Sequence, residues 1–188
     1  GGIHVVDDSA MITRGAPLLV VTQSVSKDVN PRAGTWGYIR EILQRAGVFF
    51  EELPLERISS LPGRSKAVVL LAGHLPLAAA HRQALASWVQ NGGLLIGLGG
   101  TSGLDDTFGV AGATPLAEGW LKVTAPDHAV TAGLRSSLHV FGGFAVKTQS
   151  ATSLAELESG PNAAKGHAIL ENRCGKGHTL LLAPDLIF

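Results

Sequence analysis

Residues 77–103 decide the fold, and they read LAAAHRQALASWVQNGGLLIGLGGTSG. Apolar side chains recur at helical spacing through 77–90, and Asn91-Gly92-Gly93 is typical of the left-handed turn that ends a helix. Leu94–Leu98 follows as a continuous apolar run, as expected for a strand buried on both faces of a parallel sheet. This strand leads into the glycine-rich turn Gly99–Gly103. Ligands of open α/β sheets bind beside the carboxyl ends of such strands, so the turn is the expected ligand edge.

Similar units precede this segment. Apolar runs at Pro17–Val21, Val48–Phe50 and Ala67–Leu71 are expected strands, and a helix is expected to begin at Thr35 and to stop at Gly47. Strand-length runs that alternate with helix-length stretches predict βαβ units and a parallel sheet. We therefore expect a flavodoxin-like α/β fold of three layers, in which helices cover both faces of a parallel sheet.

The second half of the chain is β-rich, and helical patterns are nearly absent from it. Cys174-Gly175-Lys176-Gly177 is typical of a hairpin turn before a last core strand. We expect this half to extend the sheet, as an antiparallel edge, within a single domain that spans residues 1–188. The expected strands are Trp120–Thr124, Leu138–Val146, Ser153–Leu157, His167–Asn172 and Thr179–Leu182.

Length and composition limit the classes of protein that fit. A chain of 188 residues can build one core without a metal or disulfide staple. Lys and Arg total 15, as do Asp and Glu, so the formal charge is zero and no nucleic-acid partner is expected. The single Cys174 allows neither an intramolecular disulfide nor a thiolate metal site. The apolar runs are far shorter than the roughly 20 residues of a transmembrane helix, so no membrane span is expected.

The sequence at the two ends of the chain also allows a prediction. Gly1-Gly2 stands where an initiator Met would be, and the chain stops at Phe188 shortly after a strand-like run. We expect an artificial start and a domain excised from a longer protein. The expected domain is soluble, and its compartment, cytoplasm or periplasm, depends on the sequence that would precede it.

Three segments, taken in order, resemble the class I glutamine amidotransferase-like superfamily. The first segment is the expected helix 77–90 with Asn91-Gly92-Gly93, the strand Leu94–Leu98 and its glycine turn. The second segment, Asp127–Leu134, is similar to the HP(I/V)T.GL segment of the superfamily. The third segment, Gly175–Leu182, is similar to its late GKG.V strand. They look closest to the trimerisation domains of bacterial β-galactosidases and to trehalose-utilisation-like proteins. The resemblance covers nearly the whole chain and implies a carbohydrate- or envelope-related bacterial protein.

The chain departs from this superfamily at the catalytic position. Amidotransferases carry a nucleophile elbow of the form G-x-C-x-G after the strand that matches Leu94–Leu98, but the turn here has Thr101 and Ser102 and no cysteine. Cys174 lies far downstream and does not match the elbow. The resemblance therefore implies that glutamine hydrolysis is absent, and we expect a non-catalytic binding or assembly module.

The alternative is a hydrolase with a reassigned site at the same edge. His74 follows the third expected strand, where an imidazole could act as a general base or bind a ligand. Ser102 is the candidate nucleophile, although Leu104 replaces the second glycine of a G-x-S-x-G elbow; a helix-capping serine is the other interpretation. Asp105 and Asp106 could bind a sugar hydroxyl, or could only favour the start of a helix. The remaining candidates at the ligand edge are Gly99, Gly100, Thr101 and Gly103.

Neither a metal nor a cofactor is predicted. The histidines show no H-x-x-x-H or H-E-x-x-H spacing, and Ser102 stands where a G-x-G-x-x-G pattern counted from Gly97 needs its last glycine. The expected partners are a second copy of the chain, flanking domains of the same protein, or a small-molecule or sugar ligand. Self-association is also favoured by aromatic residues whose burial the sequence leaves open, namely Trp36, Trp120 and Phe141.

Overall fold

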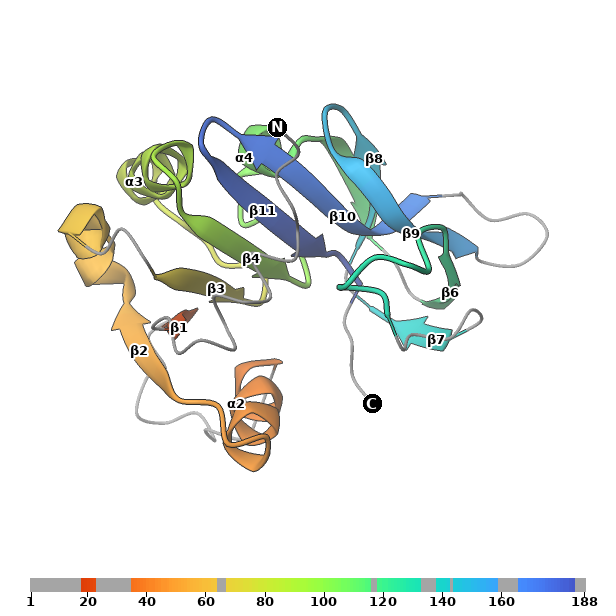
Figure 1. Ribbon diagram of the computed structural model, residues 1–188, viewed down its shortest axis with the longest axis horizontal. Coiled ribbons are helices and arrows are strands. Elements are labelled where there is room, and N and C mark those ends of the chain that lie inside the picture. The colour runs from red at the N-terminus through yellow and green to blue at the C-terminus, as the bar shows by residue number, and fades with distance from the viewer. Residues whose placement is uncertain are drawn as a thin grey trace.

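The computed structural model describes residues 18–22, 35–63, 67–115, 118–132, 138–142, 144–158 and 166–184. Their strands form one mixed sheet of 11 strands, in the order β2-β1-β3-β4-β11-β10-β9-β6-β7, with β5 and β8 as a branch. Figure 1 shows the parallel strands at one end of this sheet and the antiparallel strands at the other. The expected α/β class is confirmed. The side chains of Trp36 and Phe141, and the ends of the chain, lie outside the described residues.

The strands that we expected from the first half of the chain make the parallel part of the sheet. β1 (Leu18–Thr22) lies between β2 (Phe50–Pro54) and β3 (Val68–Ala72), and β4 (Leu94–Leu98) lies between β3 and β11 (Gly177–Leu182). The second strand was expected at 48–50, but pairing with β1 begins only at Phe50 and continues to Pro54. The expectation was wrong because the partly exposed run EELP lacks the apolar pattern of its neighbours.

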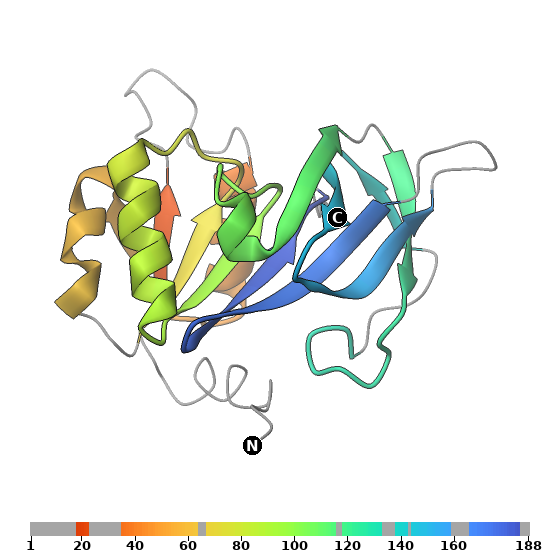
Figure 2. The same ribbon diagram turned by 90° about the horizontal axis from the view of Figure 1, so that it is seen from above.

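Alternate side chains of the parallel strands pack on opposite faces of the sheet. Leu19, Val21, Val69 and Leu71 belong to a core that includes residues of α3 (Ala79–Gln90) and of the 3-10 helix η1 (Leu55–Gly63). On the other face, Leu43 of α2 (Thr35–Arg45) packs against the cluster of Leu18, Val20, Val68 and Leu70. Figure 2 shows α3 and η1 side by side along one face of these strands. Both faces of β1, β3 and β4 are therefore largely buried, which explains the unbroken apolar runs of these three strands.

The second half of the chain extends the sheet with antiparallel strands, as expected. β10 (Gly166–Cys174) pairs with β11, β9 (Thr152–Glu158) and β8 (Phe144–Thr148), and β6 (Glu118–Val123) pairs with β9 and β7 (Leu138–Phe141). The expected strand 138–146 divides into β7 and β8 at Gly142, whose φ of 74° interrupts a strand. The short helix α4 (Asp105–Phe108) begins at the two carboxylates, as one interpretation of them allowed. The 3-10 helix η1 and the strand β5 (Val110–Pro115) were not expected.

The end of α3 is completed by the hairpin between β10 and β11. The last four carbonyl groups of the helix all accept hydrogen bonds: from the amides of Asn91, Gly92 and Gly93 inside the turn, and from Lys176 at the hairpin tip, which donates to Gln90 over 2.9 Å. Gly92 has the positive φ, 117°, that a left-handed helix end requires. The two glycine motifs quoted above, NGG and GKG, therefore contact each other and form one packing unit.

Candidate functional site

The carboxyl ends of β3, β4 and β11 meet at one edge of the sheet, where the candidate residues were expected. The segments that leave the strands there are joined by backbone hydrogen bonds. The Gly99 amide donates to the Leu182 carbonyl over 2.7 Å, and the Phe144 amide donates to the Ala183 carbonyl over 2.9 Å. The edge is therefore a connected structure built from distant parts of the chain.

His74 is exposed at this edge, and three contacts fix its ring. Its Nδ1 accepts a hydrogen bond of 3.2 Å from the Ser102 amide. Its ring centroid lies 5.2 Å from that of Phe144, with the planes tilted by 48°. Gly100 lies against the ring so closely that a Cβ there would be 2.2 Å from Nδ1. Because Nδ1 is an acceptor, the neutral ring carries its proton on Nε2.

The Ser102 hydroxyl is held by the loop that follows β3. The side chain is 2% exposed, and its Oγ accepts a 2.8 Å hydrogen bond from the Leu75 amide and donates to the Gly73 carbonyl over 3.3 Å. Only the backbone amide of Ser102 contacts His74. Ser102 also does not cap the helix that follows, since Leu104 is the N-cap of α4. The hydroxyl thus ties the glycine turn to the β3–α3 loop.

The two carboxylates lie in the first turn of α4, and they differ in surroundings. Asp105 is half-buried, and its Oδ1 accepts a hydrogen bond from the hydroxyl of the buried Thr101. Asp106 is exposed. Within the described part of the chain, no hydrogen bond or ion pair joins either carboxylate to His74. The structure therefore forms two separate pairs, His74 with Ser102 and Thr101 with Asp105.

Two other histidines, His128 and His139, have contacts outside this edge. His128 Nε2 lies 2.8 Å from Glu171 Oε2, and its Nδ1 accepts a hydrogen bond from the Val130 amide. The His139 ring stacks on Trp120 at 4.6 Å, with 5° between the planes. Among the described residues, no group of three His, Cys, Asp or Glu side chains could hold a metal ion.

Two residues of the edge were missed in the sequence. Phe144 packs on His74 from 70 positions away, and no local pattern indicates that pairing. Arg82 lies over Gly103, where a Cβ would be 3.1 Å from its Cδ, and it donates to the Leu77 carbonyl. The only signal in the sequence is the glycine content of the turn, because close approach to a neighbouring group is one reason for glycine there. In the structure, Gly100 lies against His74 and Gly103 lies against Arg82.

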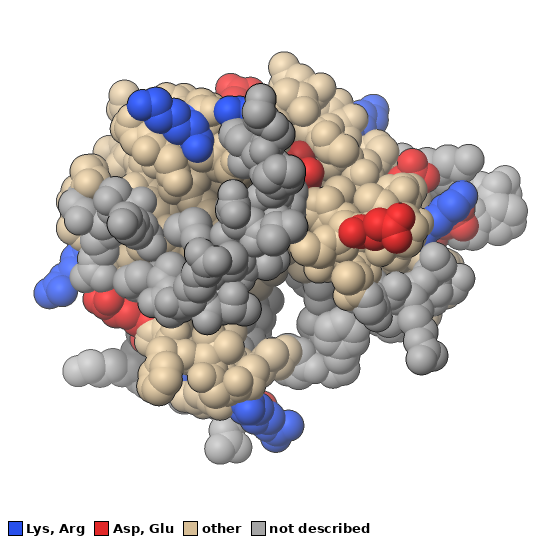
Figure 3. Space-filling model, viewed as in Figure 1, with Lys and Arg blue, Asp and Glu red and all other residues tan. Residues whose placement is uncertain are grey.

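The face of the molecule drawn in Figure 3 carries scattered charges of both signs. In the face drawn in Figure 3, the described Lys and Arg side chains alternate with Asp and Glu and form no single-sign patch. No helix in the described part of the chain is both long and apolar enough to cross a membrane.

Comparison with known proteins shows the fold and not the family. No protein-family model matches the chain, and no curated protein matches it in sequence. A cytoplasmic protein from Salmonella typhimurium matches with a TM-score of 0.63 and 13% identity, over 90% of this chain and 87% of that one. A putative ThuA-like protein from Bacteroides uniformis matches with a TM-score of 0.64 and 14% identity, over 92% and 83%.

The third similar structure is a much longer enzyme. Gan42B, a GH42 β-galactosidase from G. stearothermophilus, matches with a TM-score of 0.64 and 13% identity, over 93% of this chain. The chain spans only 28% of that enzyme. The structural neighbours thus include a ThuA-like protein and part of a β-galactosidase, which agrees with the expected fold relationship at low identity.

Proposed function

We propose that this chain is a non-catalytic, amidotransferase-like module that serves binding or assembly in a carbohydrate- or envelope-related bacterial protein. The observation that carries the proposal is that the Ser102 hydroxyl is hydrogen-bonded to backbone groups of the β3–α3 loop. The turn after β4 has no cysteine, and the buried Ser102 hydroxyl is bonded to Gly73 and Leu75, so it is a structural brace and not a free nucleophile. The carbohydrate connection rests on the β-galactosidase and ThuA-like neighbours, which is an argument by analogy of fold.

We assign a flavodoxin-like layout of three layers, supported by α2 packing on one face of the parallel strands and by α3 and η1 packing on the other. We also assign one domain over residues 1–188, part of a longer protein, whose partners are a second copy, flanking domains or a sugar. Trp120, stacked on His139 at the β6–β7 end of the sheet, is the described aromatic residue that favours self-association.

The alternative is a hydrolase that uses His74 with Ser102, Asp105 or Asp106. The observation that favours it is the 3.2 Å contact between His74 Nδ1 and the Ser102 amide, which places the two residues at one exposed edge. For Ser102 to act as a nucleophile, its hydroxyl would have to leave both backbone partners and turn to an imidazole nitrogen.

Two measurements separate these functions. Light scattering at high micromolar concentration is expected to show an oligomer, or a complex when flanking domains are restored; a monomer under both conditions contradicts assembly. Chromogenic ester and glycoside substrates are expected to show no turnover that depends on His74. Turnover that is lost in both His74→Ala and Ser102→Ala, with folding intact, would establish the hydrolase instead.

A further inference from the structure

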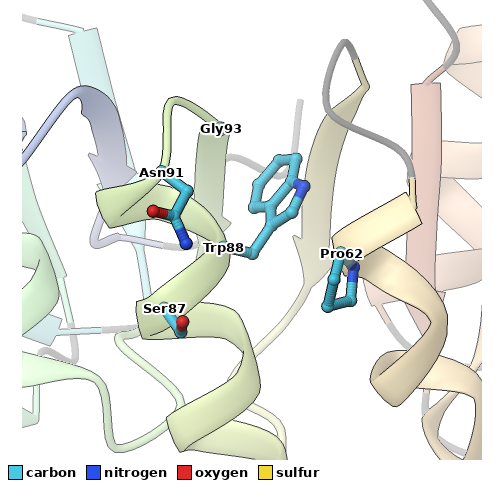
Figure 4. A pocket seen from close by; sticks show the side chains of 5 residues that line it. All are labelled: Pro62, Ser87, Trp88, Asn91 and Gly93. Carbon is cyan, nitrogen blue, oxygen red and sulfur yellow. The ribbon is translucent and has the colours of Figure 1, made fainter.

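The turn that ends α3 contains the one Asn-Gly sequence of the chain, Asn91-Gly92. Both residues are exposed, and Figure 4 shows the Asn91 carboxamide at the end of the helix, pointing away from the Trp88 indole. Within the described part of the chain this carboxamide makes no hydrogen bond. Gly92 has no side chain that could shield its backbone nitrogen. Neither the carboxamide nor the nitrogen that follows it is therefore protected by side-chain packing.

These two residues can react with each other. The Gly92 nitrogen, after losing its proton to water, attacks Asn91 Cγ and closes a five-membered succinimide ring, while the Cγ–Nδ2 bond breaks and Nδ2 leaves as ammonia. Water then opens the ring. Opening at Cγ gives an aspartyl residue, and opening at the main-chain carbonyl carbon gives an isoaspartyl residue, whose main chain runs through Cβ and Cγ. This reaction is one reason why asparagine is a thermolabile residue.

The folded end of α3 opposes the reaction in two ways. The Gly92 amide donates a hydrogen bond of 2.9 Å to the Val89 carbonyl, which holds the proton that the nitrogen must lose. The ψ of Asn91 is 7°, so the Gly92 nitrogen is eclipsed with the Asn91 backbone nitrogen. Ring closure instead needs the Gly92 nitrogen eclipsed with Cβ, within reach of Cγ. The helix end must therefore open locally before the ring can form.

The hairpin of β10 and β11 keeps this helix end closed. The Lys176 amide donates to the Gln90 carbonyl over 2.9 Å, and the His178 amide donates to the Gly93 carbonyl over 3.1 Å. These two contacts lie on either side of the reactive pair in the sequence. An isoaspartyl residue at position 91 would add one carbon atom to the main chain between them. The longer chain does not fit between the two contacts as they stand, so we expect at least one of them to be lost.

We propose that Asn91 is a site of spontaneous deamidation by the Gly92 nitrogen, and that the hairpin contacts control its rate. Molecules in which the end of α3 has opened are then modified, and the isoaspartyl product keeps the helix end open. The change is irreversible because the nitrogen is lost as ammonia. This inference does not depend on the function proposed above.

The rate is measured by mass spectrometry of the full chain after incubation in neutral buffer, as replacement of NH by O in the peptide that contains Asn91. We expect the folded protein to react at least about tenfold more slowly than the same chain in urea. Gly177→Ala is expected to raise the rate in the folded protein about fivefold or more, since its Cβ would collide with the Val89 carbonyl oxygen and push the hairpin away. Gly112→Ala, with nothing within 4 Å of its Cβ, is the matched control and should leave the rate unchanged.

Equal rates in the folded and unfolded chain, or equal rates in the two glycine variants, would overturn control by the hairpin. Absence of deamidation at Asn91 in urea would overturn the site itself. The effect of the product is tested by hydrogen exchange of the Lys176 and His178 amides. We expect faster exchange in purified isoaspartyl protein than in Asn91→Asp, which carries the same charge on an ordinary main chain. Equal exchange in the two proteins would contradict the loss of the hairpin contacts.

Discussion

The carbonyl oxygen of Val89 lies 2.0 Å from the position that a Cβ at Gly177 would occupy. The same Cβ would lie 2.4 Å from the Gly93 carbonyl oxygen, so the hairpin of β10 and β11 approaches the end of α3 backbone to backbone. Both neighbours are main-chain atoms of a capped helix end, and they cannot turn aside as a side chain would.

Gly177→Ala is therefore expected to destabilise the protein by about 1–3 kcal/mol, since the added methyl group must push the hairpin away from the helix. Urea unfolding measures the change. Gly112→Ala is the matched control: nothing lies within 4 Å of a Cβ at that strand position, and its effect is expected to be neutral or slightly stabilising. Equal stability of the two variants would contradict the close approach.

Ser102→Ala tests whether the hydroxyl is a brace. The variant leaves the Leu75 amide without its partner in a buried place, and we expect a loss of about 1–3 kcal/mol of unfolding free energy. Ser60→Ala removes an exposed hydroxyl that bonds only to the Arg57 carbonyl, and should stay within about 0.5 kcal/mol of the parent. A Ser102→Ala variant of full stability would remove the main support for a structural role.

Asn172 joins α4 to the sheet through a partly buried polar network. Its Nδ2 donates to the Thr107 carbonyl over 3.1 Å, and its Oδ1 accepts from the Ser150 hydroxyl over 3.1 Å. Asn172→Ala is expected to cost about 1–3 kcal/mol, and a double-mutant cycle with Ser150→Ala should show a coupling above about 0.5 kcal/mol. Gln149→Ala, at an exposed neighbouring position, serves as control. Additive effects of the Asn172 and Ser150 changes would mean that their contact contributes nothing.

Cys174 gives a pH-dependent prediction. Burial raises the pKa of its thiol above the ordinary value of 9.0, and the hydrogen bond with the Gln90 side chain offsets part of that rise. The folded protein therefore favours the protonated thiol more than the unfolded chain does, so this contribution to stability is complete below about pH 9 and is lost as pH rises through the folded-state pKa.

Alkylation by iodoacetamide as a function of pH measures this titration. The midpoint in the native protein is expected above that of the chain in urea, and Gln90→Ala should move it higher still because the contact that lowers the pKa is gone. A native midpoint at or below the unfolded one would contradict the assignment.

The sequence was most informative where structure is local. The helix, the left-handed turn and the apolar strand of residues 77–98 follow from spacing and from two glycines, and the structure has them within two residues of the expected bounds. β5 was missed because AGATP has the small residues and proline of a loop, and it becomes a strand only by pairing with β8.

The candidate edge was also predictable only in part. Its position after β3 and β4 was predictable, because parallel strands end together. The role of Ser102 was not, because its partners Gly73 and Leu75 lie 29 and 27 residues away and are backbone groups that any residue carries. A pattern of residue types contains no information about which carbonyl a hydroxyl will reach.

β11 lies in the interior of the sheet between β4 and β10, yet it is the last of the described strands to be synthesised. A ribosome that adds about 5–20 residues per second finishes β11 roughly 4–17 s after it finishes β4. During that interval the backbone N–H and C=O groups along one edge of β4 lack their β11 partners, and the end of α3 lacks the contact with the hairpin. The nascent chain therefore exposes a strand edge that can pair with another chain. We therefore expect the yield of folded protein to depend on protection of the incomplete chain as well as on the stability of the finished sheet.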